Sequence, residues 1–75
     1  MQIRQSARKH GVADGDIRHA LRSPLASEEL DERRVLWLGP DRAGNLLEII
    51  VLSLDQGDLV IHAMKMRSEY RRMLP

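Results

Sequence analysis

The sequence contains no cysteine, so disulfide bonds and thiolate-bound metals are excluded. It also has no apolar run near the roughly 20 residues that span a membrane, because its longest hydrophobic stretches are interrupted by Glu48, Ser53 and His62. The first residues, Met1–Arg4, contain no apolar segment typical of a signal peptide. From these absences and a length of 75 residues we expect one cytoplasmic domain over residues 1–75.

The sequence also lacks the short motifs of common cofactor and metal sites. It has no phosphate-binding glycine loop, no dinucleotide fingerprint, no zinc pattern and no nucleophile elbow. Its three histidines, His10, His19 and His62, are not at a metal-ligand spacing, and a helix break separates the first two. We therefore expect neither a cofactor nor a metal.

Charge is nearly balanced over the whole chain but strongly segregated along it. The net charge of +1 divides into +3 for residues 1–12, −5 for residues 13–64 and +3 for residues 65–75. Ten of the twelve basic residues are arginine, whose planar fork suits phosphate or carboxylate. Two basic ends around an acidic middle predict a single basic face, although a GC-rich genome would also favour arginine.

The N-terminal third has the pattern of two helices. A short helix is expected over residues 3–10, with Gly11 at its C-terminal end. A second helix should begin at Asp14, which can cap it, and should end at Ser23-Pro24. The apolar residues predicted to pack these helices on the sheet are Ile3, Ala7, Ile17, Ala20 and Leu21.

The rest of the chain has the pattern of strands. Residues 26–34 are polar and acidic, so we expect a loop there, with a weak strand at 29–31. A three-stranded antiparallel meander and a short C-terminal helix should follow, which makes the fold class α+β. The expected strands are 35–38, 46–52 and 59–64, the turns 39–45 and 55–58, and the last helix 67–74.

The segment 60–72 combines a histidine on an apolar strand with the cations of a basic helix. Metal-free RNA cleavage needs a base for the 2′-hydroxyl, an acid for the leaving 5′-oxygen and cations around the phosphorane. His62, Lys65, Arg67 and Tyr70 provide these groups. The alternative interpretation is a core histidine beside a solvated basic helix.

Glu48 stands within an otherwise apolar strand, as a general base or as a carboxylate paired across the hairpin. If the turn is the four residues 55–58, Glu48 lies opposite Lys65 and on the other face from His62. If the register slips by one residue, Glu48 and His62 share a face. We favour the first register, and we expect Trp37 to pack in the core rather than to stack on a base.

Several motifs follow one another over about residues 8–74. They are Arg8-Lys9-His10-Gly11-Val12, Pro24, Asp31-Glu32-Arg33-Arg34-Val35-Leu36-Trp37-Leu38-Gly39, Gly44-Asn45-Leu46-Leu47-Glu48-Ile49-Ile50-Val51, Ile61-His62-Ala63-Met64-Lys65 and Glu69-Tyr70-Arg71-Arg72. With these motifs in this order, the chain resembles the BrnT-type toxins, a family of the RelE/ParE toxin superfamily. The resemblance implies a small sheet carrying helices, mRNA cleavage without a metal, and neutralisation by an antitoxin.

The chain departs from the family pattern in three places. Its N-terminal part is shorter, His62 stands where the family typically has serine, and Met64 stands where it has arginine. Arg67 or Arg72 would then have to supply the cation that Met64 lacks.

The sequence thus predicts the toxin component of a type II toxin–antitoxin system, acting as a metal-independent RNA endonuclease. The alternatives are a non-catalytic RNA- or protein-binding module of the same fold, and a small protein whose apolar sheet is covered in a dimer. Expected partners are RNA, including ribosome-associated mRNA, and a cognate antitoxin protein, with no membrane. The candidate catalytic residues are His62, Lys65, Arg67, Tyr70 and Arg34, and the candidate RNA-binding residues are Arg8, Lys9, Arg33, Arg71 and Arg72.

Overall fold

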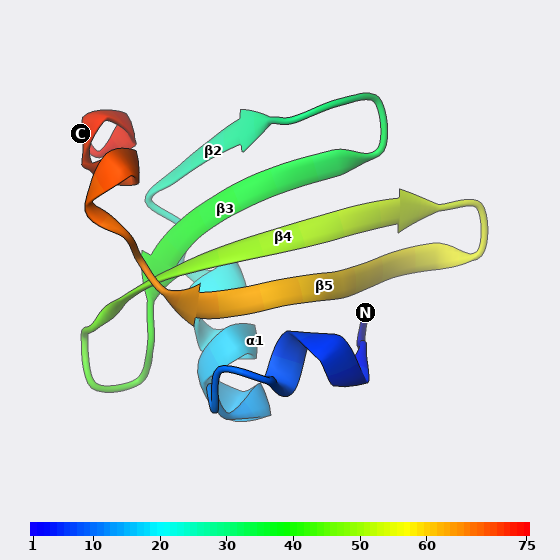
Figure 1. The fold of residues 1–75 in the computed structure, drawn as a ribbon, viewed down its shortest axis with the longest axis horizontal. Helices are drawn as coiled ribbons and strands as arrows, with labels where there is room; N and C mark the ends of the chain where they lie inside the picture. The colour runs from blue at the N-terminus through cyan, green and yellow to red at the C-terminus, as the bar shows by residue number, and fades with distance from the viewer.

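In the computed structural model, which describes residues 1–75, the chain forms one twisted five-stranded sheet (Figure 1). The order across the sheet is β1-β5-β4-β3-β2. β1 runs parallel to β5, and every other neighbouring pair is antiparallel. The strands are β1 (Gln2–Ile3), β2 (Ala26–Glu29), β3 (Arg34–Pro40), β4 (Leu46–Leu54) and β5 (Gly57–Lys65).

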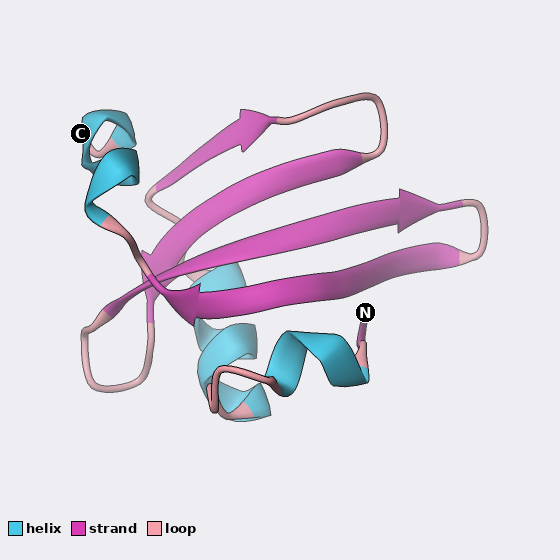
Figure 2. Ribbon diagram, viewed as in Figure 1, coloured by secondary structure: helices cyan, strands magenta, loops and turns pink.

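Three short helical segments accompany the sheet, as Figure 2 shows. The one α-helix is α1 (Asp14–Arg22), whereas η1 (Gln5–Arg8) and η2 (Ser68–Met73) are 3₁₀ helices. α1 lies on one face of the sheet against β3 and β4, and η1 contacts β5. No helix is long and apolar enough to cross a bilayer.

The expected architecture, two N-terminal helices with a three-stranded meander, is wrong. The three predicted strands are present as β3, β4 and β5, but β2 and β1 extend them at the two edges, which makes the sheet five-stranded and mixed. Only one of the two predicted N-terminal helices is an α-helix, and the C-terminal helix is a 3₁₀ segment. The class α+β holds at the coarse level.

The segment predicted as the first helix forms β1 and η1 instead. The N–H of Arg4 donates to the carbonyl oxygen of Val60 at 2.9 Å, directly after β1 pairs with β5. A segment with only Ile3 and Ala7 on its apolar side is too short to sustain an α-helix alone. Pairing with the edge of β5 satisfies backbone groups that an isolated turn would leave to water.

The polar segment predicted as a loop contains the edge strand β2, which pairs with β3. An edge strand has a neighbour on one side only, so it tolerates polar residues and leaves little trace in the hydrophobic pattern. The strand ends at Glu29, so it shares only one residue with the predicted weak strand at 29–31. The side chain of Asp31 closes the following turn, because its Oδ1 accepts the N–H groups of Arg33 and Arg34 at 3.0 and 2.8 Å.

The main hydrophobic core lies between α1 and the sheet. Gly39 on β3 permits the close approach, because a Cβ atom there would meet the backbone carbonyl oxygen of Ala20. Trp37 is partly buried against the same core, as predicted. The buried members of the core are Ala7, Ile17, Ala20, Leu47, Ile49, Val51, Val60 and Ala63.

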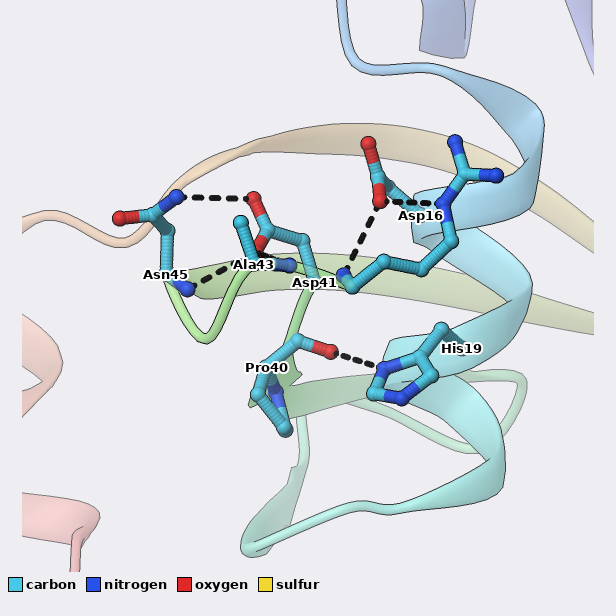
Figure 3. Close-up of polar contacts among 7 residues, drawn as sticks. Asp16, His19, Pro40, Asp41, Ala43 and Asn45 are labelled. Atoms are coloured by element: carbon cyan, nitrogen blue, oxygen red, sulfur yellow. Dashed lines mark hydrogen bonds and ion pairs between the residues drawn. The ribbon is translucent and has the colours of Figure 1, made fainter.

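The turn between β3 and β4 begins at Asp41 rather than at residue 39, since β3 continues through Pro40 (Figure 3). The Oδ1 atom of Asp41 accepts the N–H groups of Ala43 and Asn45 at 2.9 and 2.8 Å. Such a side-chain acceptor replaces backbone partners and fixes the turn.

The end of β3 and the turn after it are each tied to α1 by a polar contact, as Figure 3 also shows. Asp16 of α1 accepts the backbone N–H and the Nε–H of Arg42 at 3.0 and 2.8 Å. The Nδ1 atom of His19 lies 2.9 Å from the carbonyl oxygen of Pro40. His19 therefore has a structural contact within the fold.

The register between β4 and β5 is the one we did not favour from the sequence. The turn contains two residues instead of the four at 55–58, since Leu54 pairs with Gly57. A β-bulge then leaves Ile61 without an opposite partner and shifts the remaining pairs by one residue.

As a result, Glu48 pairs with Met64, whereas Lys65 pairs with Leu47. Glu48 and His62 therefore lie on the same face of the sheet, the face opposite α1. The prediction that separated these two side chains is wrong, because it allowed for neither the tight turn nor the bulge.

Candidate active site

Glu48 is the one fully buried charged side chain, with 0% of its surface exposed. It projects from β4 on the face opposite α1, beside the buried Leu38 of β3. An ionised carboxylate in such a place requires hydrogen bonds or an opposite charge, because burial removes its hydration.

Arg67 supplies three of the hydrogen bonds to this carboxylate. Oε1 of Glu48 accepts the backbone N–H of Arg67 at 2.9 Å and its Nε–H at 3.1 Å, and Oε2 accepts Nη2–H at 2.7 Å. This is the bidentate geometry that guanidinium and carboxylate favour, with a backbone donor added. The Arg67 side chain is 48% exposed, and its Nη1 has no protein acceptor.

His62 supplies the fourth hydrogen bond, from β5. Its Nε2 lies 3.0 Å from Oε2 of Glu48, and the pair lies at the edge of the buried region. Burial alone raises the pKa of Glu48, but the hydrogen bonds from Arg67 and His62 outweigh it and hold this pKa below its ordinary value. Glu48 is therefore ionised near neutral pH.

The ionised carboxylate fixes the tautomer of the neutral His62 ring. An acceptor-only partner requires the proton on Nε2, so Nδ1 carries the lone pair. Nδ1 has no hydrogen-bond partner in the protein. Every buried side-chain nitrogen and oxygen in this structure does have a partner, so Nδ1 is not one of the buried atoms. It follows that Nδ1 is open to solvent, which is the arrangement of a histidine base oriented by a carboxylate.

Two further rings border this group. The guanidinium carbon of Arg67 lies 5.7 Å from the centre of the Tyr70 ring, within the range of a cation–π contact. The ring of His10 meets that of His62 edge to face, with centres 5.7 Å apart and an interplanar angle of 78°. We call the five residues Glu48, His62, Arg67, Tyr70 and His10 the Glu48 cluster.

Three of the five candidate catalytic residues come together in this cluster: His62, Arg67 and Tyr70. Lys65 does not join them on the same face. It pairs with Leu47, whose side chain belongs to the core under α1, so Lys65 projects toward the α1 side and is exposed.

Arg34 lies at the other end of the sheet. It pairs with Leu52, four residues along β4 from Glu48, or about 13 Å at the usual rise of a strand. Its guanidinium binds Asp31 at 2.8 Å. Arg33 lies at the same distant end, so neither arginine is part of the Glu48 cluster.

The other candidate RNA-binding residues do not form the predicted single basic face. Arg8 is paired with a carboxylate of α1, and Arg72 binds Glu28 of β2 at 3.1 Å. η1 lies against β5, whereas β2 is the edge strand farthest from it. The basic ends therefore reach different edges of the sheet, although Lys9 and Arg71 are exposed and have no carboxylate partner.

Sequence reasoning missed His10 as a neighbour of His62. Their contact depends on the pairing of β1 with β5, and a two-residue strand has almost no sequence signal. Gly11, which has a φ of +77°, marks a sharp change of chain direction directly after His10. This glycine is the one local sequence feature that indicates the change of chain direction beside His10.

No group of three or more histidine or carboxylate side chains is arranged to hold a metal ion. Comparisons with protein-family models, with curated proteins and with solved structures found no match. An assignment of function must therefore begin from the geometry of the Glu48 cluster.

Proposed function

We propose that the protein is a metal-independent RNA endonuclease in which His62 activates the attacking hydroxyl. The observation that supports this proposal is the hydrogen bond between His62 Nε2 and the buried Glu48, together with the open Nδ1. A carboxylate that holds the ring and leaves one nitrogen free is a recurrent way to prepare a histidine for proton transfer.

In this mechanism Nδ1 of His62 takes the proton of a ribose 2′-hydroxyl. The 2′-oxygen then attacks the adjacent phosphorus, and Glu48 stabilises the imidazolium that forms. Arg67 contributes positive charge to the crowded phosphorane through its free Nη1. Arg67 thereby supplies a cation in the neighbourhood where Met64 replaces the arginine of the BrnT-type toxins.

The wider biological role follows from the resemblance to those toxins. A ribonuclease of this kind would act in the cytoplasm on RNA, including mRNA on ribosomes, as the toxin of a type II toxin–antitoxin pair. A cognate antitoxin would then neutralise it. Co-expression with the product of the adjacent reading frame tests this role, because growth arrest should occur without that product and disappear with it.

The catalytic proposal is tested with purified protein, single-stranded RNA and an excess of EDTA. The wild-type protein should release fragments that end in a 2′,3′-cyclic phosphate, and His62→Ala should slow cleavage by about 100-fold, the usual scale for a lost proton-transfer group. Arg33→Ala, at the distant end of the sheet, is the control and should cut at the wild-type rate. Folded wild-type protein that cuts nothing, alone or with ribosomes, would contradict the proposal.

A second candidate function is RNA binding without cleavage. It is favoured by the saturation of Glu48, whose four hydrogen bonds also suit a purely structural cross-link between β4, β5 and the segment before η2. On this alternative, RNA binds in a salt-dependent way and stays intact, and His62→Ala changes affinity alone.

A further inference from the structure

His10 is placed beside His62 by the N-terminal segment. The segment is held on β5 through β1 and η1, and the N–H of Gly11 closes a turn on the carbonyl oxygen of Arg8 at 3.0 Å. The two imidazole rings then meet edge to face with their centres 5.7 Å apart. Two histidines from opposite ends of the chain thus share one small area at the edge of β5.

The two rings differ in their surroundings. His62 is held by Glu48, which fixes its outer nitrogen as an acceptor. His10 is exposed and has no hydrogen-bond partner. The open hollow of about 340 Å³ that it lines extends toward α1, past Lys65, Asp16 and Asp41, and does not include His62. One histidine is therefore oriented by a carboxylate, whereas the other has no protein partner and is free to contact a substrate bound beside His62.

We propose that His10 is a second catalytic residue of this site, the acid that protonates the leaving 5′-oxygen while His62 acts as the base. The proposal rests on the ribonuclease function proposed above. Each nitrogen needs to lie only about 3 Å from its own oxygen, the ribose 2′-oxygen for His62 and the leaving 5′-oxygen for His10. Rings with centres 5.7 Å apart can satisfy both contacts on one phosphate group.

The step balances without water or a metal. The 2′-hydroxyl proton passes to Nδ1 of His62 as the bond between the 2′-oxygen and phosphorus forms. The bond between phosphorus and the 5′-oxygen breaks, and that oxygen takes the proton of His10. The products are a 2′,3′-cyclic phosphate and a 5′-hydroxyl, with His62 protonated and His10 neutral, and a proton exchange with solvent restores both.

The other candidate acids are less well placed. Tyr70 contacts the guanidinium of Arg67, whereas the ring that meets His62 is that of His10. Lys65 projects from the α1 side of the sheet. His10 is the titratable side chain in direct ring contact with His62.

A substrate with sulfur in place of the leaving 5′-oxygen tests this assignment, because a thiolate leaves without a proton. On ordinary RNA, His10→Ala should cut about 100-fold more slowly than wild type. On the 5′-thio substrate, His10→Ala should approach the wild-type rate, whereas His62→Ala should remain slow because the base is still missing. His10→Ala should fold normally, since the side chain is exposed, and circular dichroism checks this.

Each of the other possible outcomes contradicts the proposal. A wild-type protein that cleaves, with His10→Ala equally fast on ordinary RNA, would overturn the acid role alone. An equal loss for His10→Ala on both substrates would make His10 a positioning residue and would also overturn the proposal. Folded wild-type protein that cleaves neither substrate would overturn the ribonuclease function, and the histidine pair with it.

Discussion

Glu48 and His62 meet across β4 and β5 because the chain combines a two-residue turn with one unpaired residue, Ile61. Without the bulge, this part of β5 would pair with β4 one residue out of its present register, and His62 would no longer share a face of the sheet with Glu48. β-Bulges frequently re-aim a side chain near a functional site. Here the bulge directs an imidazole at a buried carboxylate.

Glu48→Gln should lower the stability of the fold. The substitution keeps the shape but removes the charge, so the donors of Arg67 and His62 lose a strong acceptor. We expect the free energy of unfolding to fall by about 2 kcal/mol, in the range for an impaired buried polar group. Urea unfolding followed by tryptophan fluorescence measures it. Glu28→Gln is the matched control and should change stability by less than about 1 kcal/mol, because its pair with Arg72 is exposed.

Stability should fall in acid. Hydrogen bonds lower the pKa values of Glu48, Asp14, Asp16 and Asp31 in the folded state. The unfolded chain therefore binds protons first as the pH drops, so the stabilisation is complete above the ordinary carboxyl pKa values and is lost through the lower, folded ones. Urea midpoints should decline below about pH 5, and Glu48→Gln should decline less steeply. A flat profile down to pH 3 would contradict this expectation.

Arg67 and Arg34 should differ in their effect on cleavage. Arg67→Ala removes the guanidinium beside His62 and should lower kcat by about 100-fold, the scale for losing one stabilising donor. Arg34→Ala should leave kcat unchanged, because Arg34 lies at the distant end of the sheet. Rates at saturating RNA separate this effect from weaker binding. Equal losses in both variants would place the chemistry elsewhere.

Gly39→Ala should loosen the packing of α1. The added Cβ would meet the carbonyl oxygen of Ala20, a backbone atom that cannot rotate away. We expect a loss of about 1–3 kcal/mol, typical of overpacking. Gly15→Ala is the control, since its Cβ would meet only the mobile end of Arg42, 2.7 Å away at Nη1, and alanine favours the helix. Thermal unfolding of both variants measures the difference.

The central strands and α1 could be predicted from the sequence, whereas both sheet edges could not. β3, β4 and β5 have long apolar patterns, and α1 has a regular apolar stripe through Ile17, Ala20 and Leu21. β1 has two residues and β2 is polar, so tertiary pairing rather than local preference decides both. Hydrophobic periodicity does not report on such edges.

The candidate site could be predicted in its residue types but not in its geometry. His62, Arg67 and Tyr70 are neighbours in the sequence, and they remain neighbours in the fold. The role of Glu48 depended on a register that one bulge controls, and a bulge has no reliable sequence signal. Arg34 lies apart from the Glu48 cluster, and a short motif does not indicate which end of a strand a side chain occupies.

The parallel pairing of β1 with β5 also determines when the Glu48 cluster can form during synthesis of the chain. β1 is translated well before β5, the strand with which it must pair. Until β5 has been translated, His10 lacks its contact with His62, and Glu48 lacks the hydrogen bonds from His62 and Arg67. The complete arrangement therefore arises only after β5 and the segment that follows it have been translated.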